Sequence, residues 1–128
     1  MGSVKRLLFV FVFFLALLSF FQFSVPELIG QDAWLHAGMA KVISQEGFID
    51  AFPYTTESIF AESYADLQWG FRLLLIPFLL FGAILGVKIA SVFFGAVFFV
   101  VLYWYLLKRE ISRPFFWTFL AAVVSSEL

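Results

Sequence analysis

The chain of 128 residues contains no cysteine, a single histidine and few charged residues. Without cysteine it can form no disulfide, no thiolate metal site and no cysteine nucleophile. Charged residues make up 13% of the sequence, against about 25% in an average soluble domain. The sequence has no phosphate-binding glycine loop, no Ser-His-Asp order and no HExxH pattern. These absences exclude the sites with the most specific sequence signatures, and we also expect no nucleic-acid partner.

Apolar residues are abundant instead, at 63% of the chain against roughly 45–50% in an average domain. Lys5 and Arg6 precede an apolar run from Leu7 to about Val25, long enough to cross about 30 Å of hydrocarbon. A cleaved signal peptide begins in the same way, but no small-x-small cleavage site follows this run. We therefore predict that residues 1–25 form a short cytoplasmic segment and a retained transmembrane helix.

Residues 26–66 form the only extended polar region, which we predict to be an acidic extracytoplasmic loop. Within it, residues 32–46 are predicted to form a helix, because apolar side chains recur at helical spacing. Asp32 is suited to the N-cap, and Gly47 is suited to end the helix. The following stretch, 48–60, is predicted to be an extended loop. The acidic residues are Glu27, Asp32, Glu46, Asp50, Glu57, Glu62 and Asp66, against one basic residue, Lys41.

The apolar region 67–107 allows two interpretations. Hydropathy alone suggests two membrane spans, but two further crossings would leave the basic residues 108–113 outside. A single transmembrane helix over 87–107 keeps them in the cytoplasm, as the positive-inside rule favours. Residues 67–86 then form an interfacial or re-entrant helix on the outer face, which suits Pro77.

Several side chains acquire roles in that single-crossing topology. Lys88 is expected to extend toward the outer surface, and Tyr103, Trp104 and Tyr105 to form an aromatic belt at the inner surface. Small residues at a spacing of four are expected to be helix-packing contacts: Gly82 with Gly86, and Ser91 with Gly95.

The last segments complete a multi-pass topology. Residues 108–113 are predicted to be a basic cytoplasmic turn, and residues 114–128 the start of a third transmembrane helix that is truncated, or else a half-inserted tail. The fold class is therefore all-α, a polytopic membrane protein with an outer-face loop that carries one or two short helices. We expect an integral protein of the plasma membrane, of a prokaryote, with its N-terminus in the cytoplasm and the lipid bilayer as its first partner.

Three stretches resemble the N-terminal part of the GT-C superfamily of polytopic glycosyltransferases, such as protein O-mannosyltransferases and oligosaccharyltransferase catalytic subunits. Residues 30–36, continuing to Phe48, are similar to the first-loop motif of the family. Residues 64–71, followed by 73–78, are similar to the stretch before its outer-face helix, and residues 88–109 to the next span. The chain differs from the O-mannosyltransferases in having Asp32-Ala33 in place of an Asp-Glu pair.

The resemblance implies transfer of a sugar from a polyprenyl-phosphate donor on the extracytoplasmic face, to an acceptor that the sequence does not identify. Asp32 is the implied catalytic residue, either as general base or as a ligand of a divalent cation, Mg²⁺ or Mn²⁺. The alternative is that Asp32 only caps its helix, and the two roles are compatible.

Three further side chains are candidates for substrate binding, each with a simpler alternative. His36 follows Asp32 by one helical turn and would share a proton or cation with it, or be an ordinary surface residue. Asp66 would face the same cavity, or only cap the next helix. Arg72 is shaped to hold a phosphate, or extends to lipid headgroups.

Two other functions stay open at this point. The chain is alternatively a non-enzymatic small membrane subunit or transporter fragment that binds a partner through its acidic loop. A third interpretation is a fragment of a lipid flippase or polymer ligase, since such proteins also present charged outer loops to polyprenyl lipids. Even for a glycosyltransferase, we expect the fragment alone to be inactive.

Overall fold

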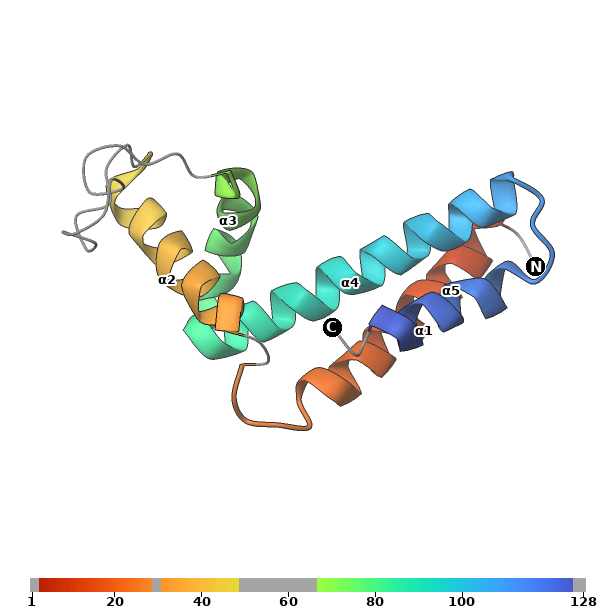
Figure 1. Cartoon of the computed structure of the whole chain (residues 1–128), viewed down its shortest axis with the longest axis horizontal. Coiled ribbons are helices and arrows are strands. Elements are labelled where there is room, and N and C mark those ends of the chain that lie inside the picture. The colour runs from red at the N-terminus through yellow and green to blue at the C-terminus, as the bar shows by residue number, and fades with distance from the viewer. Residues whose placement is uncertain (1–2, 29–30, 49–66, 126–128) are drawn as a thin grey trace. The chain divides into compact units, whose positions relative to one another are not determined.

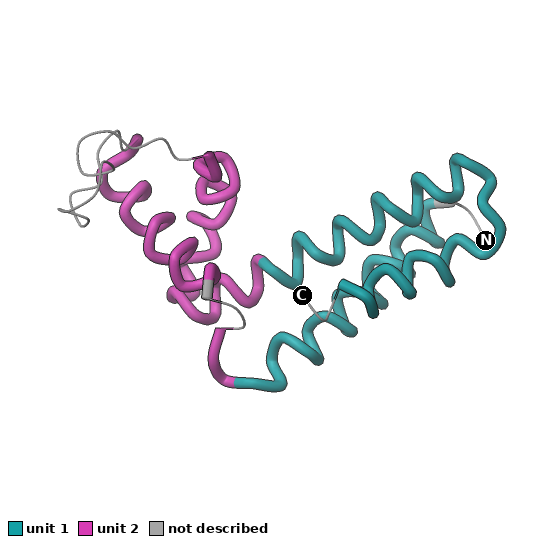
Figure 2. Tube along the Cα trace, viewed as in Figure 1, with its two compact units in different colours: residues 1–25, 91–128 teal, residues 26–90 magenta. Residues whose placement is uncertain are grey.

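Helices account for every regular element in the part of the chain that the structure describes. The computed structural model describes residues 3–28, 31–48 and 67–125. These ranges contain five α-helices and one 3₁₀-helix: α1 (Ser3–Gln22), α2 (Gln31–Glu46), α3 (Trp69–Leu75), η2 (Ile76–Phe81), α4 (Ala83–Lys108) and α5 (Pro114–Ser125). The α-helices are labelled in Figure 1. The predicted all-α class is confirmed for these residues. The chain divides into two compact units, residues 1–25 with 91–128, and residues 26–90 (Figure 2).

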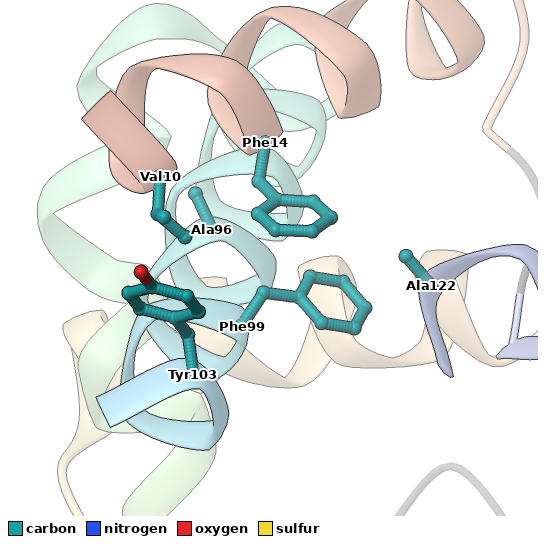
Figure 3. Packing of buried hydrophobic residues seen from close by; sticks show 6 residues of the cluster. All are labelled: Val10, Phe14, Ala96, Phe99, Tyr103 and Ala122. Carbon is teal, nitrogen blue, oxygen red and sulfur yellow. The ribbon is translucent and has the colours of Figure 1, made fainter. Parts of the chain in front are cut away.

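Unit 1 is a bundle of α1, α5 and the part of α4 from Ser91 onward. Its core contains two side chains from α1, three from α4 and one from α5: Val10, Phe14, Ala96, Phe99, Tyr103 and Ala122 (Figure 3). The rings of Phe13 and Phe115 meet edge to face, with centroids 5.2 Å apart, and join α5 to α1. Phenylalanine therefore supplies much of the contact between these helices.

The outward surfaces of α1 and α4 carry large apolar side chains. Phe9 is 57% exposed on α1, and Phe98 is 61% exposed on α4. Two helices, Val4–Gln22 and Ala83–Lys108, are long and apolar enough to cross a membrane by length and composition. These two features indicate a membrane protein, because lipid is the solvent that suits such surfaces.

Unit 2 contains α2, α3, η2 and the start of α4. Helix α2 packs against both α3 and η2. It ends as predicted, since Gly47 adopts a φ of 82° and its N–H donates to the carbonyl of Ile43 at 2.9 Å. A small apolar cluster of Leu28, Ala37 and Val87 holds the base of α2 against the first turns of α4.

The region 67–86 is a short, interrupted helical segment. Helix α3 gives way to the 3₁₀-helix η2, which has Pro77 at its start. Gly82 then takes a φ of 90°, and α4 begins at the next residue. A Cβ on Gly86 would lie 2.7 Å from the carbonyl carbon of Phe78, so α4 approaches η2 closely where glycine permits it.

In the region 67–107, α4 is the one helix long and apolar enough to cross a membrane by length and composition, and residues 69–81 form a shorter apolar segment. Helix α4 begins at Ala83, before the predicted Val87, and ends at Lys108. In the region predicted to start a third transmembrane helix, the structure has α5, an apolar helix of 12 residues.

Three predictions about individual residues are wrong. Asp32 lies within the first turn of α2, which begins at Gln31, so it is not the N-cap. Lys88 is 3% exposed and does not extend to a surface, because the start of α4 is packed within unit 2. Tyr103 is buried in the core of unit 1, whereas its neighbours Trp104 and Tyr105 are exposed as a belt requires.

The turn between α4 and α5 has a defined backbone structure. Glu110, two positions after the last residue of α4, adopts a φ of 54°. Its N–H donates to the carbonyl of Leu107, and the N–H of Ile111 donates to that of Leu106, both at 3.1 Å. These two bonds form a Schellman motif with Glu110 at the position that usually holds glycine. Arg113 also has a positive φ, of 55°, and Pro114 begins α5.

Candidate functional site

The candidate site lies in unit 2, on α2 and α3. Asp32 is exposed in the first turn of α2, where the positive end of the helix dipole favours a carboxylate. An exposed carboxylate at this place is accessible to a substrate or an ion. The apolar residues of α2 recur at helical spacing, and the helix packs against α3 and η2. Among these, Ala37, Met39, Ala40 and Ile43 are buried.

His36 is half-buried one turn after Asp32, and its ring lies against α3. The imidazole meets the ring of Phe71 edge to face, with centroids 5.2 Å apart and planes at 81°. Its Nδ1 is buried, and no residue in the described ranges forms a hydrogen bond with it. The structure therefore places His36 between α2 and α3, away from an ordinary surface position.

Arg72 follows Phe71 on α3 and is 3% exposed. Its backbone N–H donates to the carbonyl of Gln68 at 3.0 Å, which continues the helix. A side chain buried in this way does not extend to lipid headgroups. Unit 2 thus contains two buried cations, Arg72 and Lys88.

An aromatic pair connects the end of α2 to the start of α3. The rings of Phe48 and Trp69 meet edge to face, with centroids 6.0 Å apart. The indole Nε1 of Trp69 is buried, and no hydrogen bond reaches it from the described part of the chain. Neither this aromatic pair nor the burial of Lys88 was predicted from the sequence. The one sign of a buried lysine in the sequence is the position of Lys88 within the first turns of an apolar helix.

The structure brings His36 together with the segment that carries Arg72, and it leaves Asp32 exposed nearby on α2. Asp66, the remaining candidate, and the predicted extended loop 48–60 apart from Phe48 lie outside the described residues. Within residues 3–28, 31–48 and 67–125, no group of three or more His, Cys, Asp or Glu side chains could hold a metal ion. Asp32 and His36 alone would supply two ligands at most.

Comparison with known proteins adds no relative. No protein-family model matches the chain, and no curated protein or solved structure matches it significantly.

Proposed function

We propose that the chain is the N-terminal part of an integral membrane glycosyltransferase of the GT-C type, which uses a polyprenyl-phosphate-linked sugar on the extracytoplasmic face. The observation that carries the proposal is the exposed carboxylate of Asp32 in the first turn of α2. The resemblance of residues 30–48 to the first-loop motif of that superfamily supports it. Two helices long and apolar enough to span a bilayer supply the membrane attachment that a lipid-borne donor requires.

In this proposal, Asp32 acts as general base toward the acceptor. The acceptor nucleophile forms a bond to the anomeric carbon and gives its proton to the Asp32 carboxylate. The bond between the anomeric carbon and the phosphate oxygen breaks, and the electron pair leaves with the polyprenyl phosphate. His36, held against Phe71, has a fixed position one turn from Asp32 and contributes to substrate binding.

Arg72 and Asp66 are proposed to bind substrate in the same site. A guanidinium pairs well with phosphate because its N–H groups form two parallel hydrogen bonds with phosphate oxygens. A divalent cation, Mg²⁺ or Mn²⁺, stays a prediction. The described residues do not complete a ligand set for it.

The test is sugar transfer by the full-length protein, purified in detergent with a polyprenyl-phosphate sugar donor. We expect Asp32→Asn to reduce the rate by about a hundredfold or more, as loss of a general base does. Glu46→Gln is the matched control, since it removes one exposed carboxylate from the other end of the same helix. That variant should keep wild-type activity.

Two results would contradict the proposal at different levels. Transfer that survives Asp32→Asn would remove the catalytic role of Asp32. Absence of transfer by the wild-type protein with each of several polyprenyl donors would reject the glycosyltransferase itself. Circular dichroism of both variants checks that the helices are intact.

A further inference from the structure

Unit 1 has an open pocket of about 530 Å³ that sequence analysis did not anticipate. It lies where α1 begins, α4 ends and α5 begins, and its volume is within the roughly 300–1,000 Å³ typical of small-molecule sites. Six of the residues that line it carry the argument: Arg6, Phe9, Tyr103, Leu107, Arg113 and Phe115. The pocket belongs to the unit that does not contain Asp32.

The pocket combines two cations with an apolar wall. Arg6 and Arg113 are separated by more than 100 positions in the sequence, yet both line it. Phe9 and Phe115 form part of the wall, and their rings are in contact, with centroids 6.3 Å apart. A site of this kind fits a molecule that has an anionic head and an apolar tail.

The charge around the pocket is strongly positive. The first turn of α1 and the turn between α4 and α5 carry five cations, Lys5, Arg6, Lys108, Arg109 and Arg113, and one acid, Glu110. Lys108 and Arg109 lie over the rings of Trp104 and Tyr105, at 6.0 and 5.4 Å from the centroids. Arg6 and Arg113 line the pocket instead, where their planar guanidinium groups suit phosphate oxygens.

We propose that this pocket binds one anionic glycerophospholipid, with its phosphate between Arg6 and Arg113 and the first part of an acyl chain against Phe9 and Phe115. Clusters of four to eight basic residues beside membrane helices are a recurring form of anionic-lipid site. The α5 helix begins at Pro114 beside the pocket, so the positive end of its dipole adds to the attraction. The inference is independent of the proposed glycosyltransferase activity.

The experiment measures lipid binding to the detergent-purified chain by native mass spectrometry. Dioleoyl phosphatidylglycerol is the probe, and dioleoyl phosphatidylcholine has the same chains without net negative charge. We expect phosphatidylglycerol to bind roughly tenfold or more tightly than phosphatidylcholine, because its head adds an uncompensated anion. Inorganic phosphate should not displace it, because the free ion lacks the tail.

Two double variants with the same charge change separate the pocket from its surroundings. Arg6→Gln with Arg113→Gln should weaken phosphatidylglycerol binding roughly tenfold or more, since two charge-assisted contacts are lost. Lys5→Gln with Arg109→Gln leaves the pocket lining intact and should weaken phosphatidylglycerol binding about threefold or less. Arg6→Lys with Arg113→Lys keeps both charges and should still weaken binding, because lysine cannot make the paired contacts.

Each opposing result would overturn the proposal. Equal losses in the two glutamine pairs would mean diffuse attraction with no defined site. Equal binding of the two lipids would mean an apolar groove without headgroup selection, and displacement by phosphate would mean a site for the free ion. Wild-type affinity in the lysine pair would contradict the guanidinium–phosphate contact. Because that pair keeps both charges, it still tests the proposal if the glutamine pair does not fold.

Discussion

Phe14 of α1 and Phe99 of α4 stack in the core of unit 1, with ring centroids 4.7 Å apart and planes at 25° (Figure 3). Both side chains are buried. We expect Phe14→Ala and Phe99→Ala each to lower the free energy of unfolding by about 3 kcal/mol, because the deletion leaves a cavity. The double variant should reveal a coupling of about 1 kcal/mol from the ring pair. Unfolding by sodium dodecyl sulfate in mixed micelles measures the stability of both single variants and of the double variant, and the coupling follows from these values.

Phe98→Ala is the control for this cycle. Phe98 lies on the same helix but is 61% exposed. Its loss should change the free energy of unfolding by about 0.5 kcal/mol or less. A cost at Phe98 equal to that at Phe99 would contradict the packing described for unit 1.

Substitution by alanine should have opposite effects on stability at two glycines of unit 2. Gly86→Ala should destabilise the protein by about 1–3 kcal/mol, because the new Cβ meets the backbone of Phe78. Gly38→Ala should stabilise it by about 0.5–1 kcal/mol, since Gly38 is inside α2 with nothing within 4 Å of the added Cβ. Thermal unfolding followed by circular dichroism compares them. Equal tolerance at both positions would show that α4 and η2 are not in close contact.

Glu110→Gly should raise the free energy of unfolding by about 1 kcal/mol. Glu110 has a φ of 54°, a conformation that costs an L-residue roughly 1–2 kcal/mol and costs glycine little. Glu110→Ala removes the same carboxylate without relieving the backbone, and it should give no such gain. If alanine stabilised the protein as much as glycine, the gain would come from the lost charge.

Two serines test the predicted topology. Ser44→Cys lies near the end of α2, and Ser112→Cys lies in the turn between α4 and α5; both positions are exposed. Because the chain has no cysteine, each variant has a single reactive thiol. An impermeant maleimide should label position 44 only from outside the cell and position 112 only from the cytoplasmic side. Labelling of position 112 from outside would reverse the direction assigned to α4.

His36→Phe separates structure from function at the candidate site. Phenylalanine keeps the ring contact with Phe71 and removes the buried Nδ1, so stability should rise by about 1 kcal/mol. His36→Ala loses the ring and should lower stability. If His36 binds substrate as proposed, His36→Phe should still reduce sugar transfer in the full-length protein. Reduced stability in His36→Phe would instead mean that the imidazole is hydrogen-bonded.

The parts of the fold that were predicted correctly have local causes. The helix over 32–46 follows from the apolar period and from Gly47, whose positive φ ends it. Local chemistry of this kind is visible in a single sequence because it requires no knowledge of distant partners.

The features that were not predicted depend on contacts between distant residues. Lys88 was expected at a surface, but the packing of unit 2 buries it. Arg6 and Arg113 gave no sign of a shared pocket, because only the arrangement of α1, α4 and α5 brings them together. A turn was predicted at 108–113, but not the positive φ of Glu110, because glutamate gives no signal for a conformation that glycine usually adopts.

Helix α4 has different surroundings in its first two turns and in the rest of its length, and this difference sets how much of it is free to cross a bilayer. The segment 83–90 belongs to unit 2, where Gly86, Val87, Lys88 and Ala90 are buried by protein. The remaining part, Ser91–Lys108, is about 27 Å long at the α-helical rise. In the membrane that we propose, this length matches a thin hydrocarbon layer without tilting. Acyl-chain length should therefore control how well the protein is accommodated, with hydrophobic mismatch growing as the lipids lengthen.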